Sequence, residues 1–340
     1  MICAAHLETS GLTIEHEKFE FSEFPGRYGI PVIGFVFATI VVLTFDAYWN
    51  HGGASVALIV LAVGLLIGIS ASRWLTRRGP LHMQWLKAHS VNLIARRGNP
   101  RVWLVAHIDS KSQTIPMLAR ITSIVTALLA IGIMGVSLAS SWIATIRGDL
   151  DWSQAEWIMI SAAVALLATI PLIFCLTGNR SPGAVDNASG VISVLLAARA
   201  LEARPDLGVI ITSGEELALV GARAFVESHP APAIALNCDT VDDVGEFRCM
   251  VSGKRGALAA AVDRAATRLE LNVPIKSVIV GILADSIAFS DAGWDSVTLS
   301  RGNIATLARV HTSSDSLERL TGTGIAKAAR LLAATVEELS

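Results

Sequence analysis

The chain has 340 residues, of which 52% are hydrophobic and only 16% are charged. Soluble globular domains carry about 25% charged residues, so the composition excludes an ordinary soluble domain as the whole of the protein. The formal net charge of −2 gives no electrostatic support to nucleic-acid binding. Four cysteines without C-x-x-C spacing argue against a disulfide framework and against a cysteine zinc site.

The first 28 residues form a polar, acidic segment that lacks the features of a cleavable signal peptide. Four long apolar runs then occur in two pairs, and each approaches the ~20 residues that cross about 30 Å of hydrocarbon as a helix. An alternative is four buried helices of a large soluble core, but such cores rarely contain four uncharged runs of this length. The predicted spans are residues 30–49, 55–72, 121–145 and 157–177.

Lysine and arginine residues flank these runs unevenly. They occur before the first run, after the second, before the third and after the fourth, whereas the turn between the first two runs has none. Positively charged flanks favour the cytoplasmic side of a membrane. The sequence therefore predicts a multi-pass integral membrane protein in which both termini and the polar remainder of the chain are cytoplasmic.

Outside the apolar runs, predicted strands alternate with predicted helices, which is typical of an α/β sandwich. The predicted strands are residues 91–95, 102–106, 208–213, 233–238 and 247–252. The predicted helices are residues 187–203, 217–228, 256–270 and 324–338.

Five side chains of the kinds that bind metals are spread over these segments. Two imidazoles and three carboxylates form a ligand set that suits a pair of zinc ions, although other divalent metals can occupy the same ligands. The five residues are His107 in VAHIDS, Asp186 in GAVDNASG, Glu216 in TSGEELALVGA, Asp239 in LNCDT and His311 in VHTSSD.

Two further acids accompany these ligands. Asp109 follows His107 in an H-x-D spacing, in which a carboxylate can orient a metal-binding imidazole. Glu215 directly precedes Glu216, and neighbours on an extended segment point in opposite directions, so one can bind metal while the other faces the reacting water.

Each of these signals alone also has an ordinary structural explanation. Asp186 lies where an acid can cap a helix, and the Glu215–Glu216 pair suits the first turn of a helix. The other six histidines lie in loops or polar surroundings, and we interpret them as surface residues.

In their order along the chain, the segments H-x-D, GAxDNASG, SGEELALVGA, an acid after a strand, and H-T-x-x-D resemble peptidase family 28. This family comprises dinuclear zinc aminopeptidases and glutamate-carboxypeptidase-like exopeptidases. The resemblance covers roughly residues 90–115 and 180–340, including the segment ADSIAFSDAGWDSVTLSRG ahead of the last histidine. It implies a three-layer sandwich with a mixed central sheet, to which four transmembrane helices are added.

The resemblance also implies roles for the site residues. His107 and Asp239 would bind one zinc, Glu216 and His311 the other, and Asp186 would bridge the two. Glu215 would act as the general base, with Asp109 supporting His107. The implied protein is a membrane-anchored exopeptidase with peptide substrates, most simply an aminopeptidase.

The chain departs from the family pattern because Asp186 lies 79 positions after His107, where the family usually has a short loop. The third and fourth apolar runs fill that interval, so we predict a transmembrane hairpin inserted in the catalytic domain. The predicted parts are a polar segment (1–28), a transmembrane hairpin (29–74), a peptidase domain (80–116 and 178–340) and an inserted hairpin (117–177).

Three other functions remain as alternatives. A glutaminyl cyclase has a similar fold but uses one zinc, which five ligands argue against. A non-catalytic scaffold with this fold usually loses ligands, and none is missing here. A small transporter would carry broken helices near the midplane, and Pro171 is the clearest breaker in the spans. The sequence does not specify an oligomeric state.

Overall fold

The fold is described from a computed structural model that covers residues 2–148, 153–253, 255–278 and 281–339. The chain divides into two compact units. The first unit comprises Met1–Glu23, Pro80–Ser112 and Gly178–Ser340, and the second comprises Phe24–Gly79 and Gln113–Thr177. The second unit is thus inserted into the first at two places along the sequence.

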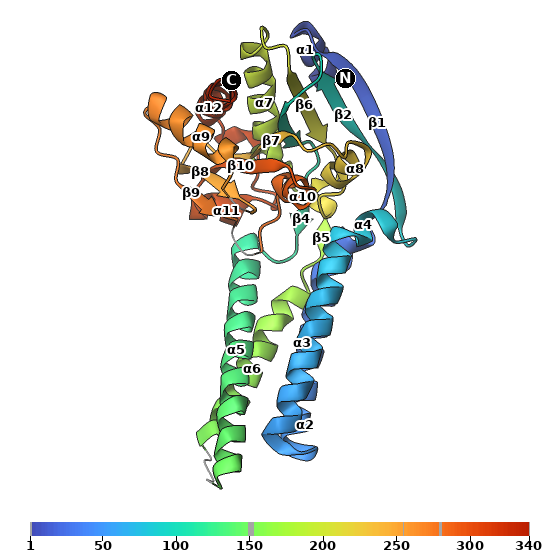
Figure 1. The fold of residues 1–340 in the computed structure, drawn as a ribbon, viewed down its shortest axis with the longest axis vertical. Helices are drawn as coiled ribbons and strands as arrows, with labels where there is room; N and C mark the ends of the chain where they lie inside the picture. The colour runs from blue at the N-terminus through green and yellow to red at the C-terminus, as the bar shows by residue number, and fades with distance from the viewer. Residues whose placement is uncertain (1, 149–152, 254, 279–280, 340) are drawn as a thin grey trace. The chain divides into compact units, whose positions relative to one another are not determined.

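A mixed eight-stranded sheet forms the middle of the first unit, in the order β1-β2-β6-β3-β7-β10-β8-β9 (Figure 1). Strands β6, β3, β7 and β10 are mutually parallel, while β1, β2 and β8 pair antiparallel to their inner neighbours. The strands are β1 (Thr13–Ser22), β2 (Lys87–Arg96), β3 (Val102–His107), β6 (Leu207–Thr212), β7 (Ile234–Val241), β8 (Glu246–Val251), β9 (Ile275–Ser277) and β10 (Asp295–Gly302).

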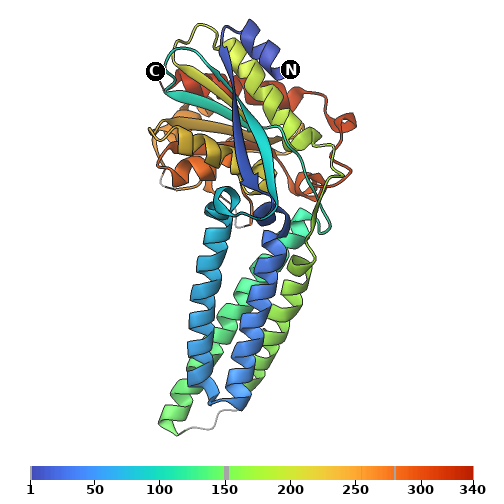
Figure 2. The same ribbon diagram turned by 90° about the vertical axis from the view of Figure 1, so that its right-hand side faces the viewer.

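Helices cover both faces of this sheet, which makes three layers. Helices α1, α7, α9 and α12 belong to one face, and α8 and α10 to the other (Figure 2). The helices of this unit are α1 (Ile2–Thr9), α4 (Gly79–His82), α7 (Ser189–Ala200), α8 (Val220–Ser228), α9 (Ala257–Arg268), α10 (Asp285–Asp291), α11 (Ile304–Arg309) and α12 (Thr323–Glu337).

The side chains of strand β3 pack alternately into the hydrophobic clusters on the two faces of the sheet. Its residues alternate, so Leu104 and Ala106 contact the α7 face while Trp103 and Val105 contact the α8 face. All six residues of the strand are buried, as expected for a parallel strand covered on both sides. His107 is the last of these six residues, so the strand holds this imidazole rigidly.

The N-terminal segment corrects one sequence-based boundary. The sequence predicts a separate polar segment over residues 1–28, whereas residues 2–22 contain α1 and the ten-residue edge strand β1, which pairs with β2 along its whole length, and α2 begins at Phe24. Most side chains of β1 are exposed or half-buried, and the charges at the exposed positions hide the strand pattern in the sequence.

The second unit consists of four long helices in which each helix packs against two others (Figure 1). They are α2 (Phe24–Asn50), α3 (Gly53–Arg77), α5 (Met117–Arg147) and α6 (Ser153–Ile173). The short strands β4 (Ser112–Gln113) and β5 (Thr177–Gly178) pair where the chain enters and leaves the insertion.

These helices match the four predicted spans, since all four are long and apolar enough to cross a membrane. Their inward residues form a core of their own, whereas large apolar side chains such as Phe35, Leu66, Val136 and Leu167 are more than 60% exposed. Exposed apolar surface of this extent is costly in water and favourable in lipid.

Candidate metal centre

The parallel strands bring the predicted ligands to one edge of the sheet. Strands β6, β3, β7 and β10 are adjacent and end on the same side, which is where α/β sheets bind ligands. Five of the six side chains lie at or after these strand ends. His107 is the last residue of β3, Glu215 and Glu216 follow β6, Asp239 lies near the end of β7, and His311 follows β10 and α11. The sixth, Asp186, precedes α7.

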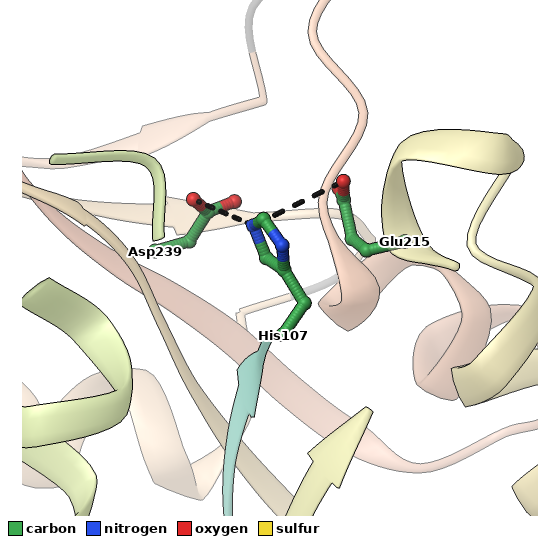
Figure 3. Close-up of side chains that lie close together, drawn as sticks. All are labelled: His107, Glu215 and Asp239. Atoms are coloured by element: carbon green, nitrogen blue, oxygen red, sulfur yellow. Dashed lines mark ion pairs between the residues drawn. The ribbon is translucent and has the colours of Figure 1, made fainter. Parts of the chain in front are cut away.

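One group comprises His107, Glu215 and Asp239, whose ligand atoms lie within 4.8 Å of one another. The Nε2 atom of His107 is 3.5 Å from Asp239 Oδ1 and 3.9 Å from Glu215 Oε2. Figure 3 shows the imidazole between the two carboxylates, each supplied by a different segment. All three residues are buried.

A second group comprises Asp186, Glu216 and His311, again within 4.8 Å of one another and buried. The Nε2 atom of His311 lies 3.0 Å from both Asp186 Oδ2 and Glu216 Oε1. The other oxygen of Asp186 lies 3.1 Å from His107 Nε2. Asp186 therefore faces both groups, one oxygen toward each.

The donor atoms fit divalent cations. His107 Nε2 and Glu216 Oε1 are buried and have no hydrogen-bond partner among the described residues. Buried polar atoms in folded proteins are nearly always satisfied, so such atoms aimed at carboxylates and imidazoles are suited to bind a cation. Imidazole and carboxylate donors are those that zinc accepts. The residues thus provide two candidate cation positions that share Asp186.

The two adjacent glutamates differ in their ionisation. Burial raises the pKa of Glu215 well above its ordinary value, and the charges of Glu216 and Asp239 raise it further. Burial also pushes the pKa of Glu216 upward, but His311 and Lys111 outweigh it and lower that pKa to about 2. Glu216 is thus suited to hold a cation, whereas the raised pKa of Glu215 suits this carboxylate to accept a proton.

The imidazole of His107 responds to the same acidic surroundings. Burial opposes its charged form, but Glu215, Asp186 and Asp239 outweigh burial and raise its pKa well above the ordinary value. The site attracts positive charge strongly, as a cation-binding centre requires.

Asp109 contacts more than the imidazole that the H-x-D spacing suggested. The His107 Nδ1–H donates to the backbone oxygen of Asp109 at 3.0 Å, and the Asp109 carboxylate is 3.8 Å from that nitrogen. The carboxylate instead accepts the backbone N–H groups of Gly214, Glu215 and Glu216 at 2.8, 3.1 and 3.1 Å. Asp109 therefore holds the glutamate loop in place.

Local backbone geometry corrects two predicted helix starts. The helix predicted from residue 187 begins at Ser189, because Asp186 and Asn187 have non-helical backbone angles and Asp186 is not a helix cap. The helix predicted from residue 217 begins at Val220, because Ala218 and Leu219 have left-handed φ angles of 76° and 60°. At the first place the irregular backbone carries Asp186, and at the second it separates α8 from the short 3-10 turn Glu215–Leu217 that carries both glutamates.

Sequence reasoning did not single out three residues beside the centre. Asp315 accepts the backbone N–H groups of Val185 and Asp186 at 2.7 and 3.2 Å, and its place in H-T-x-x-D is a usable signal. Asp285 is fully buried, and burial raises its pKa to about 7. Lys111 lies 2.6 Å from Glu216 Oε2, and nothing in the sequence marks it.

The six remaining histidines belong to neither group, and over the part of the chain that is described only these two groups were found.

A model of the family described as Peptidase family M28 matches residues 143–336, which is more than half of the chain. The matched range contains Asp186, Glu215, Glu216, Asp239 and His311 and begins after His107. A search of curated protein sequences gave no match.

Several solved structures are similar to the chain. A zinc aminopeptidase from Bacillus subtilis is 19% identical with a TM-score of 0.48, over 74% of this chain and 50% of that one. The LapA aminopeptidase of Legionella pneumophila is 14% identical with a TM-score of 0.48, over 92% and 74%. A glutaminyl cyclase from Tannerella forsythia is 12% identical with a TM-score of 0.48, over 99% and 87%. The chain thus spans about half the length of the first of these.

Proposed function

Because this chain belongs to peptidase family M28, we propose that it is a membrane-anchored, two-zinc exopeptidase that removes amino-terminal residues from peptides. The observation that carries the proposal is the pair of buried groups of potential ligands, with one oxygen of Asp186 near the imidazole of each group. We assign His107 and Asp239 to one zinc, Glu216 and His311 to the other, and Asp186 to both.

Two divalent cations at these positions would polarise the scissile carbonyl and acidify a water molecule. Glu215 removes a proton from that water as the water oxygen bonds to the carbonyl carbon. Glu215 then passes the proton to the amide nitrogen, so the C–N bond breaks and a neutral amine departs. The raised pKa of Glu215 supports this role, because it makes the carboxylate a stronger base than an ordinary glutamate.

Asp109 contributes by position. Its carboxylate holds three successive backbone N–H groups, which fixes the loop carrying Glu215 and Glu216. Its backbone oxygen fixes the ring of His107 with Nε2 directed at the cation position.

The choice of the amino terminus is supported by charge. Carboxylates predominate around the two groups, and the amino terminus of a peptide is a cation that such a field attracts. The only lysine at the groups in the described part of the chain, Lys111, is engaged by Glu216. A carboxypeptidase would instead need a free cation to bind the terminal carboxylate.

The test is metal content and hydrolysis of aminoacyl-arylamides by the full chain purified in detergent, beside Glu215→Gln. We expect two zinc ions per chain in both proteins and loss of at least 100-fold in kcat in the variant. Asp263→Asn, a change of an exposed acid on α9, is the matched control and should leave both readouts unchanged.

Other outcomes point to other functions. Two zinc ions with cleavage only from the carboxyl end would replace the aminopeptidase by a carboxypeptidase. One zinc per chain with cyclisation of amino-terminal glutamine would favour the cyclase. Absence of bound metal in a folded protein would favour a non-catalytic scaffold.

We also propose that the four helices of the second unit span the membrane with both chain ends in the cytoplasm. The proposal rests on their length and composition and on the positions of lysine and arginine. Single cysteines at Ser55, beside the α2–α3 turn, and at Thr267, on α9, should label from opposite sides of a sealed cell membrane. If both cysteines were labelled from outside the cell, the proposal that the first unit is cytoplasmic would be rejected.

A further inference from the structure

Lys111 approaches the metal centre from the loop that follows β3. Its ammonium group lies 2.6 Å from Glu216 Oε2, and it also donates to the backbone oxygen of Glu216 at 3.4 Å. The side chains are only 15% and 4% exposed, so the ion pair is shielded from solvent. A pair so placed restricts the rotation of the glutamate side chain.

The two oxygens of Glu216 therefore have separate environments. Oε2 is held by Lys111, while Oε1 lies 3.0 Å from His311 Nε2 and has no hydrogen-bond partner among the described residues. A carboxylate held in this way presents one oxygen to a cation and cannot easily turn to present both.

The two imidazoles of the centre are supported unequally. The ring of His107 is oriented by its Nδ1–H bond to the backbone oxygen of Asp109. The Nδ1 atom of His311 is buried without a hydrogen-bond partner in the described residues. Metal-binding histidines nearly always have such a partner on the second nitrogen. At the His311 position, orientation must come from another ligand, and Glu216 is the ligand that is held.

We propose that Lys111 is a positioning residue that fixes Glu216 as a one-oxygen ligand and thereby sets the metal affinity of the His311 position alone. This inference rests on the proposed function, because it requires that the two groups bind cations. It makes the two positions unequal: the backbone oxygen of Asp109 orients the His107 ring at one, and Lys111 orients the Glu216 carboxylate at the other.

The experiment is a zinc titration of the metal-free full chain in detergent against a chromophoric chelator. Lys111→Met removes the ammonium and keeps the length of the side chain, while Lys111→Arg keeps the charge. Lys327→Gln, an exposed lysine on α12, is the matched control. We expect Lys111→Met to bind its first zinc as the wild type does and its second about 10- to 100-fold more weakly. Lys111→Arg should recover most of the loss, and the control should show none.

A second background assigns the effect to one position. With His311→Ala, which disables that position, Lys111→Met should change the remaining zinc affinity less than twofold. With His107→Ala, it should weaken the remaining zinc about 10-fold or more. If Lys111→Met does not fold, Lys111→Gln should show the same selective loss at smaller size.

If Lys111→Met binds each of the two zinc ions with the wild-type affinity, the inference is overturned and the proposed function stands. Tighter binding in the variant would also overturn it, because Lys111 would then repel the cation instead of positioning its ligand. A wild-type protein that binds no divalent metal would overturn both.

Discussion

Replacing Asp109 with asparagine separates its two possible actions, on His107 and on the glutamate loop. In the structure one carboxylate oxygen accepts from Gly214 and Glu215, and the other accepts from Glu216. Asparagine keeps one acceptor oxygen and turns an NH2 group toward at least one backbone N–H. The variant therefore loses one or two hydrogen bonds to a charged acceptor.

Each such bond contributes about 1.5–3 kcal/mol, so the loop that carries Glu215 should lose about 2–3 kcal/mol of local stability in the more favourable orientation. A loss of this size lowers the protection of an amide against hydrogen exchange about 30- to 150-fold when exchange occurs by local opening. Backbone hydrogen exchange of the peptide spanning residues 213–219, followed by mass spectrometry of metal-free protein, measures it directly.

The control is Asp263→Asn, whose side chain is exposed on α9, and it should leave exchange in this peptide unchanged. Unchanged protection of residues 214–216 in Asp109→Asn, together with weaker metal binding, would refute the reasoning. Asp109 would then act on His107 alone, as the H-x-D spacing by itself suggested.

Three further predictions concern stability. Burial raises the pKa of Asp285 from 3.8 to about 7, so in metal-free protein this group lowers the free energy of unfolding as pH rises from about 4 to about 7. Asp285→Asn should remove that pH dependence. In urea titrations the variant should be more stable than the wild type by up to about 4 kcal/mol at pH 8, with no gain at pH 4. A Cβ at Gly208 would lie 2.2–2.6 Å from ring atoms of Trp103, so Gly208→Ala should lower stability by about 1–3 kcal/mol and lower Tm, whereas Gly132→Ala, where nothing lies within 4 Å, should not. Chelation of bound metal should lower Tm and zinc should restore it, since a ligand at 100 times its Kd stabilises by about 2.7 kcal/mol; a Tm that ignores both would contradict the metal centre.

The sequence predicted which segments form helices and strands better than it predicted which segments pair or pack with one another. The four apolar runs are helices with nearly the predicted bounds, because a run of about 20 apolar residues is a signal that needs no tertiary context. Strand β1 escaped prediction because its charged residues face solvent at the sheet edge, and only its pairing with β2 reveals it. Helix starts at Ser189 and Val220 were missed because loops that carry ligands take backbone angles that residue preferences do not predict.

The metal centre shows the same division. Residue types and their order along the chain selected the five candidate ligands and Glu215, and the structure brings these six buried side chains together. Their roles remain predictions, and their grouping into two sets, with one oxygen of Asp186 near each of the two imidazoles, is a property of the folded chain. The sequence alone could not supply Lys111, because a lysine in a loop resembles any surface lysine until its distance to Glu216 is known.

The sequence by itself determined which segments are apolar enough for a membrane, which segments form an α/β sheet, and which side chains can bind a metal. These are properties of single residues and of short-range periodicity. The tertiary structure decided which carboxylate oxygen faces which imidazole, that Asp109 holds the glutamate loop, and that Lys111 holds Glu216. Those contacts join residues between 79 and 125 positions apart, and the adjacent parallel strands β6, β3, β7 and β10 bring their segments together.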